Sequence, residues 1–236
     1  MKLILGEFIE PFESVLLVEN IRQYWKPKKV KVILLAESHV FTTDIDRTIQ
    51  LPIIDGLIDF PTQYAKFVYC LAYGESDLTK SSRHPRRDGT PQFWKIFYSC
   101  LSYVKSNEDF FVILKSKTLF EQRIMNKVNL LKALQDMGIW LIDASICALY
   151  HNGIKPDSFK MSKAISTSWL NYTKKAIMQA NPEHVIVVGK GVANNIEHEL
   201  QKIMGANYSV IDQPNAHLSA EKHFENFQKY YHICNT

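Results

Sequence analysis

The chain has few cysteines, and their spacing predicts neither a zinc site nor a disulfide framework. The four cysteines, Cys70, Cys100, Cys147 and Cys234, are far apart, and the sequence has no CxxC pair. This spacing argues against a zinc site and a disulfide framework, and it favours buried, reduced thiols in a cytosolic protein. The eight histidines include no HxxxH pair, so no metal is expected.

Signatures of other common classes are absent as well. No GxSxG elbow is present, which argues against a serine hydrolase of that type. No apolar run approaches the length of a membrane span. Glu7, Glu10 and Glu13 near the start of the chain argue against a signal peptide. We therefore expect a cytoplasmic protein without a membrane partner.

The composition is ordinary for a globular protein. Apolar residues make up 46% and charged residues 22% of 236 residues, and the net charge is +4. A chain of this length can bury a substantial core, so we expect one domain over residues 1–236 and a monomer. The small positive excess permits nucleic-acid binding without requiring it.

Apolar runs and helical periodicities alternate along the chain. Runs rich in β-branched residues predict strands at 30–36, 139–145, 184–188 and 208–211. Helical spacing predicts helices at 8–25, 94–104, 119–137, 162–180, 192–204 and 220–231. In the first of these helices, Phe12, Leu16 and Ile21 are expected on the buried side. The run 67–73 fits either a strand or a short helix. Strands separated by such helices predict an α/β fold, with a parallel sheet covered by helices on both faces.

Polar residues follow three of the predicted strands. Glu37, Asp143 and the segment from Gln213 to His217 each stand where a strand ends. In open α/β sheets the carboxyl ends of the strands form the ligand-binding edge. Glu37 alone fits a helix-capping role equally well. Three such endings on one edge predict a site that holds a small polar group, such as a base.

The most basic stretch of the chain is the segment 80–94. It contains Arg83, Arg86 and Arg87 among serine, proline and glycine residues, which predict an exposed loop. Two interpretations stay open: a solvated surface loop, or a loop that contacts DNA phosphates.

Four segments, in chain order, resemble motifs of the uracil-DNA glycosylase superfamily. VILLAES (32–38) is similar to the strand that precedes GEAPG or GQDPYH, and GIWLIDAS (138–145) to the strand before the base-reading residue. NPEHVIVVGKGVANNI (181–196) is similar to the third strand and its turn, and VIDQPNAHLS (210–219) to the HPSPLS loop. The resemblance implies a three-layer α/β/α sandwich with a four-stranded parallel sheet. It also implies excision of a base flipped out of DNA, without a cofactor.

The resemblance also implies roles for individual residues. Glu37 takes the position of the GEAPG glutamate and would activate water and stabilise the cationic sugar. Ser38 stands where the GQDPYH branch has its aspartate, which puts the water-activating role in doubt. Gln213 takes the position of the histidine of HPSP, and His217 competes with it as the donor to the base carbonyl. Leu218 matches the leucine that fills the space of the flipped base, although a core position fits it equally well. Further expected contacts are Asn215 with the base, and Lys190 and Ser219 with DNA.

Two departures from the family pattern concern the substrate. Asp143 stands where uracil-specific members have asparagine. An ionised carboxylate can accept hydrogen bonds but cannot donate them, so its natural partner on a base is an exocyclic amine. The second oxygen of Asp143 would face the unprotonated ring nitrogen of cytosine and would need a proton to bond with it. We therefore expect a raised pKa for Asp143. Val40 replaces a tyrosine that walls off the 5-position of the base. Phe41 and Phe60 are candidates for stacking on the base, with core packing as the other interpretation. Together these positions predict excision of a 5-substituted cytosine, and such bases occur in invading viral DNA, which suggests a role in defence.

Other functions fit parts of the sequence. A repair glycosylase for uracil or a damaged base would use the same motifs. A non-catalytic DNA-binding module that keeps the fold would explain why Ser38 stands in place of the aspartate. The turn from Gly189 to Gly191 imitates the dinucleotide fingerprint of a nucleotide-cofactor enzyme of Rossmann-like fold, with Asn194 in place of the third glycine.

Overall fold

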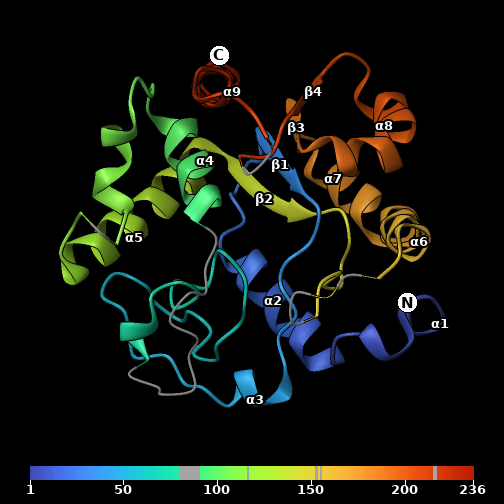
Figure 1. Cartoon of the computed structure of the whole chain (residues 1–236), viewed down its shortest axis with the longest axis horizontal. Coiled ribbons are helices and arrows are strands. Elements are labelled where there is room, and N and C mark those ends of the chain that lie inside the picture. Colours follow the sequence, from blue (N-terminus) through green and yellow to red (C-terminus); the bar gives the residue numbers. More distant parts are fainter. Residues whose placement is uncertain (80–90, 116, 152–153, 155, 215–216) are drawn as a thin grey trace.

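The fold is a four-stranded sheet enclosed by helices (Figure 1). The computed structural model describes residues 1–79, 91–115, 117–151, 154, 156–214 and 217–236. The short helical elements are α1 (Lys2–Leu5), η1 (Gly6–Phe8), α3 (Asp44–Arg47), η2 (Ser76–Leu78), η3 (Asn107–Ile113) and the π-helical turn η4 (Trp169–Thr173). The longer helices are α2 (Phe12–Tyr24), α4 (Pro91–Leu101), α5 (Phe120–Met137), α6 (Ser158–Ser168), α7 (Lys174–Ala180), α8 (Lys190–Met204) and α9 (Ala220–Cys234). The strands are β1 (Val32–Ala36), β2 (Ile139–Asp143), β3 (His184–Val188) and β4 (Tyr208–Ile211).

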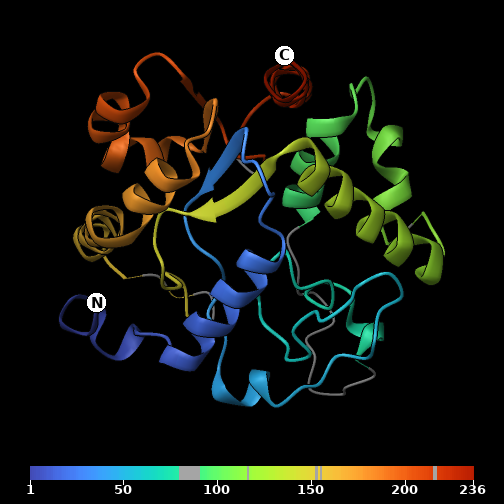
Figure 2. The ribbon, with the colours of Figure 1, turned by 180° about the vertical axis from the view of Figure 1, so that it is seen from behind.

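All four strands run parallel, in the order β2-β1-β3-β4. The helices α4 and α5 lie on one side of the sheet, and α6, α7 and α8 lie on the other (Figures 1 and 2). This arrangement confirms the predicted α/β/α sandwich. Every residue of β1 and β2 is buried, as expected for strands covered on both faces.

The predicted strand positions are confirmed, with small changes of length. β3 and β4 have the predicted bounds, whereas β1 and β2 are shorter than predicted by two residues each: 32–36 against 30–36, and 139–143 against 139–145. The helix before β2 ends at Gly138, whose φ of 83° lies in the left-handed region that glycine adopts without strain. The run 67–73 forms neither a strand nor a helix, but a buried series of turns.

The predicted orientation of the first long helix is wrong at two residues. Phe12 is 72% exposed and Leu16 is 48% exposed, whereas Leu17, Val18 and Ile21 are buried. The buried stripe is shifted because α2 packs beside β2, the edge strand of the sheet. Trp140 Nε1 of β2 donates a hydrogen bond to a backbone carbonyl of α2 over 3.1 Å.

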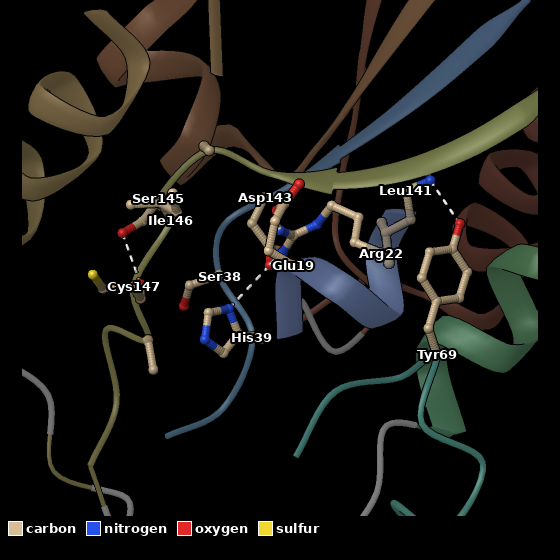
Figure 3. Close-up of polar contacts among 12 residues, drawn as sticks. Glu19, Arg22, Ser38, His39, Tyr69, Leu141, Asp143, Ser145, Ile146 and Cys147 are labelled. Carbon is tan, nitrogen blue, oxygen red and sulfur yellow. Dashed lines mark hydrogen bonds and ion pairs between the residues drawn. The ribbon is translucent and has the colours of Figure 1, made fainter. Parts of the chain in front are cut away.

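The turns at 67–73 cover the free edge of β2. The outward-facing backbone N–H of Leu141 donates to the hydroxyl of Tyr69 over 2.8 Å (Figure 3). Tyr69 is buried, and its ring stacks on Phe97 at 5.6 Å between centroids. This hydrogen bond satisfies one donor on the free edge of β2, which makes pairing with another chain at that point less favourable.

Most of the cysteine side chains are buried. Cys70, Cys100 and Cys147 are buried free thiols, as predicted, and Cys234 is half-buried. None of the described helices has the length and apolar character that a bilayer crossing needs.

Candidate functional site

The parallel order of the strands brings their carboxyl ends together along one edge of the sheet. Neighbouring ends are tied by backbone hydrogen bonds: Ser145 N donates to Glu37 O over 2.9 Å, and Gly189 N donates to Ile211 O over 2.7 Å. The ends of β2, β1, β3 and β4 therefore form one continuous row, in that order.

The turn after β3 lies beneath two of the predicted catalytic side chains. A Cβ placed on Gly189 would lie 2.7 Å from Gln213 Cγ, so the Gln213 side chain packs directly on that glycine. A Cβ placed on Gly191 would lie 3.9 Å from Glu37 Oε1. Glu37 and Gln213, from β1 and β4, thus lie over successive glycines of the turn.

These contacts give the two glycines a role that does not involve a dinucleotide. Gly189 has a φ of 98°, and its missing side chain makes room for Gln213. In a dinucleotide-binding enzyme this helix N-terminus would receive a pyrophosphate. Here the carboxylate of Glu37 lies close to it, which disfavours a second anion. The fingerprint-like turn is better explained by the packing of Glu37 and Gln213.

Glu37 is half-buried and has an aromatic neighbour that sequence analysis missed. Burial, the charge of Glu37 and a hydrogen bond with it raise the pKa of Tyr150 to about 12. The Tyr150 hydroxyl therefore stays protonated at neutral pH and can hold the carboxylate in one orientation.

Asp143 is part of a buried ion-pair network (Figure 3). Its Oδ2 atom accepts from Arg22 Nη2 at 2.6 Å and lies 3.2 Å from His39 Nδ1. Burial by itself would raise the pKa of Asp143, but the charges of Arg22 and His39 and their hydrogen bonds keep it below its ordinary value. The predicted raised pKa is therefore wrong, because a guanidinium and an imidazolium stabilise the ionised form.

His39 links Asp143 to a second buried carboxylate. Its Nε2 atom lies 2.7 Å from Glu10 Oε2, and Glu10 also accepts from the backbone N–H groups of Thr42 and Ala148, at 2.8 Å and 3.2 Å. Burial alone would lower the pKa of His39, but the two carboxylates raise it to about 9. His39 is thus positively charged at neutral pH and fixes the segment that follows Glu37.

The network continues through α2 to the π-helical turn. Arg22 Nη1 also donates to Glu19, and Glu19 accepts from the hydroxyl of Tyr172. Sequence analysis missed Glu10, Arg22 and His39. The only local signal was the position of His39 two residues after Glu37, since its partners lie far away in the chain.

Three of the predicted base-binding residues line one small cavity. Ser38, Val40 and Asp143 surround a space of about 30 Å³, together with His39, Phe67 and others. Such a volume holds about one or two water molecules and is too small for a base. Val40 N donates to Lys66 O over 3.1 Å, which closes this cavity on the side of the 66–68 segment.

The two predicted stacking residues pack in other places. Phe41 is buried, and its ring stacks on His151 at 4.0 Å between centroids. Phe60 packs edge-on against Tyr24 at 5.0 Å and lies beside Trp25 of the α2 end. These contacts favour core packing over base stacking for both residues.

The catalytic candidate His217 and the predicted DNA contacts Lys190, Leu218 and Ser219 lie at or near the surface. His217 and Ser219 are exposed and Leu218 is half-buried. Ser219 caps α9 by accepting from Lys222 N at 3.2 Å, and Lys190 forms an ion pair of 3.2 Å with Asp212. The predicted Asn215, Arg83, Arg86 and Arg87 lie outside the described residues.

Neither family models, nor curated proteins, nor solved structures gave a match to this chain. Within the described residues, no three His, Cys, Asp or Glu side chains are grouped so as to hold a metal ion. The side chains described at this edge of the sheet offer a carboxylate on Glu37, an amide on Gln213 and a phenol on Tyr150.

Proposed function

We propose that this protein is a DNA glycosylase, which flips a modified base out of DNA and hydrolyses its N-glycosidic bond. The observation that carries the proposal is the position of Glu37 and Gln213 over one glycine turn. The two side chains are a carboxylate and an amide from the ends of β1 and β4, which lie on either side of β3 in the sheet, and such groups can assist the hydrolysis of a nucleoside bond. The resemblance of the four segments to the uracil-DNA glycosylase superfamily supports the same assignment.

The reaction follows from these two side chains. The bond between the sugar C1′ and the base nitrogen breaks, its electron pair leaves with the base, and a water oxygen bonds to C1′. The Glu37 carboxylate stabilises the oxocarbenium-like sugar and accepts the proton of the water. The Gln213 amide donates to the base carbonyl as negative charge develops on it, and the departing base then takes up a proton. Tyr150 orients Glu37 by its hydrogen bond.

The target we propose is a 5-substituted cytosine. Arg22 and His39 both contact Asp143 Oδ2, and an ionised carboxylate has further acceptor sites on Oδ1. Oδ1 can accept from an exocyclic amine, such as that of cytosine, whereas uracil has none. Val40 in place of a larger residue leaves room at the 5-position. Excision of normal cytosine would damage the genome of the cell itself, so a modified base, as in invading viral DNA, fits the enzyme better.

The proposal requires that the cavity beside Asp143 widen when a nucleotide enters. Its present volume of about 30 Å³ excludes a pyrimidine. The wall formed by residues 66–68 is tied to the segment after β1 through Val40 N and through Thr42 Oγ1, which accepts from Lys66 N at 2.9 Å. Base entry would separate these two segments.

The test is an incubation with duplexes that carry a single 5-hydroxymethylcytosine, cytosine or uracil, followed by alkali cleavage of abasic sites. We expect cleavage of the 5-substituted cytosine strand. Cleavage of uracil alone would reject the substrate, and the absence of abasic sites on all duplexes, including ones with larger 5-substituents, would reject the activity.

The matching variant is Glu37→Gln, which keeps the shape of the side chain but cannot accept a proton. We expect its rate of base release to fall by about 10²-fold or more, with DNA binding unchanged. Glu13→Gln on the exposed side of α2 is the control and should keep the wild-type rate. Equal rates for the two variants would remove Glu37 from the mechanism.

A further inference from the structure

A second hollow opens between α4 and α9, next to the loop that carries Gln213. Its volume is about 350 Å³, an order of magnitude larger than the cavity beside Asp143. Its described lining includes Lys95, Asn107, Pro214, His223, Phe224 and Phe227. Pro214, which lines the hollow, directly follows Gln213, so the hollow adjoins the loop that carries one of the proposed reacting side chains.

The hollow combines an aromatic wall with a cation, Lys95, for which the described residues supply no ion pair. Phe224 and Phe227 form part of the wall, with ring centroids 6.4 Å apart. Lys95 Nζ lies 5.0 Å from the centroid of Phe110, and burial alone lowers the pKa of Lys95. The described ion pairs of the chain include none for Lys95, and no carboxylate occurs among the described residues that line the hollow.

Two helices also begin at this hollow. Pro91 and Gln92 belong to the first turn of α4, and Ala220 and His223 to the first turn of α9; all four line the hollow. Helix N-termini carry partial positive charge, which adds to the field of Lys95. The electrostatics therefore favour an anion, and the aromatic wall favours a flat ring beside it.

We propose that the α4–α9 hollow binds one nucleotide of the DNA strand, next to the nucleotide that is excised. The phosphate would bind Lys95 and His223, and the base would stack on Phe224. This inference rests on the proposed function for the identity of the strand, and it adds a second nucleotide subsite to the first. A free phosphate would use the same cation but would not need the aromatic wall.

The test measures binding of a short fluorescein-labelled single-stranded DNA, without a modified base, by anisotropy at several salt concentrations. Lys95→Gln should lower the slope of log K against log salt by about one, as expected for the loss of one phosphate contact. Lys229→Gln, on the exposed side of α9, makes the same change of charge and should leave affinity and slope close to those of the wild type. Equal slopes for Lys95→Gln and Lys229→Gln would overturn the inference.

The aromatic part is tested with Phe224→Leu, which keeps an apolar side chain without a ring. We expect about tenfold weaker binding of the oligonucleotide, from the loss of one stacking contact. Inorganic phosphate should compete poorly. If phosphate competes as well as a nucleotide does and Phe224→Leu binds normally, the hollow holds an anion only and the nucleotide assignment is overturned.

Cleavage assays separate this inference from the proposed function. With the modified duplex, Lys95→Gln should raise KM and leave kcat unchanged. If the wild type forms no abasic sites but binds the oligonucleotide through Lys95, the glycosylase proposal fails and the subsite stands. If the wild type cleaves and Lys95→Gln matches Lys229→Gln in KM and in binding, the subsite fails and the glycosylase stands.

Discussion

Gln213 packs on Gly189 so closely that a Cβ on the glycine would lie 2.7 Å from Gln213 Cγ. This contact joins the loop after β4 to the turn after β3, and through Gly191 to Glu37, the residue that follows β1. The geometry of the proposed site therefore depends on a glycine that contributes no functional group.

Replacement of this glycine should disturb both stability and activity. Gly189→Ala places a Cβ in contact with Gln213 and keeps a φ of 98° that alanine disfavours. We expect a loss of more than about 1 kcal/mol in the free energy of unfolding, and slower base release because Gln213 is displaced. Urea unfolding and the alkali-cleavage assay measure the two effects.

Gly191→Ala is the matched control in the same turn. Its Cβ would lie 3.9 Å from Glu37 Oε1, an ordinary van der Waals distance. Alanine in the helix there should change the free energy of unfolding by less than about 1 kcal/mol. Equal losses for the two variants would show that contact with Gln213 is not the cause.

The ion pair between Arg22 and Asp143 should matter more for stability than an exposed pair. Both side chains are only 3% exposed, and Arg22→Met leaves the buried Asp143 carboxylate with His39 as its one cationic partner among the described residues. We expect a loss of about 3 kcal/mol in urea unfolding. Lys29→Met breaks the exposed pair with Glu183 and should lose less than about 1 kcal/mol. If Arg22→Met lost no more free energy of unfolding than Lys29→Met, the network would not have the structural role we assign to it.

The charge of His39 should make stability depend on pH in the alkaline range. Since its pKa is about 9 in the folded chain and about 6.5 when unfolded, its contribution is complete below pH 6.5 and is lost as pH rises through 9. The difference in free energy of unfolding between the wild type and His39→Gln should therefore shrink from pH 6.5 to pH 10. Chemical unfolding at each pH measures this difference.

The comparison with the variant is needed because buried tyrosines and cysteines also titrate at high pH. These groups are common to the wild type and His39→Gln, so their effect cancels in the difference. His198→Gln, at an exposed site, should follow the wild-type curve. A difference that stays constant over this range would mean that His39 is neutral in the folded protein.

The cover of the β2 edge gives a further prediction. Tyr69→Phe keeps the stacked ring but leaves the buried N–H of Leu141 without its acceptor. We expect a loss of about 1–3 kcal/mol in the free energy of unfolding. Tyr103→Phe, on the surface, should be close to neutral, and the same result for Tyr69→Phe would indicate that another group satisfies Leu141.

The sequence by itself determined the layered fold. The bounds of β3 and β4 and the end of α5 at Gly138 could be predicted because they depend on neighbouring residues: a continuous apolar run, or a glycine that accepts a positive φ. The row of polar strand ends at Glu37, Asp143 and Gln213 followed from the parallel order alone.

Only the tertiary structure decided the environment of each side chain. Phe12 and Leu16 fit the apolar side of a helix, but the edge of β2 selects the neighbouring stripe with Leu17 and Val18. Asp143 has a lowered pKa because Arg22, 121 residues away in the chain, reaches it from α2. Local sequence patterns cannot identify such partners, because burial and charge pairing arise only when distant segments pack together.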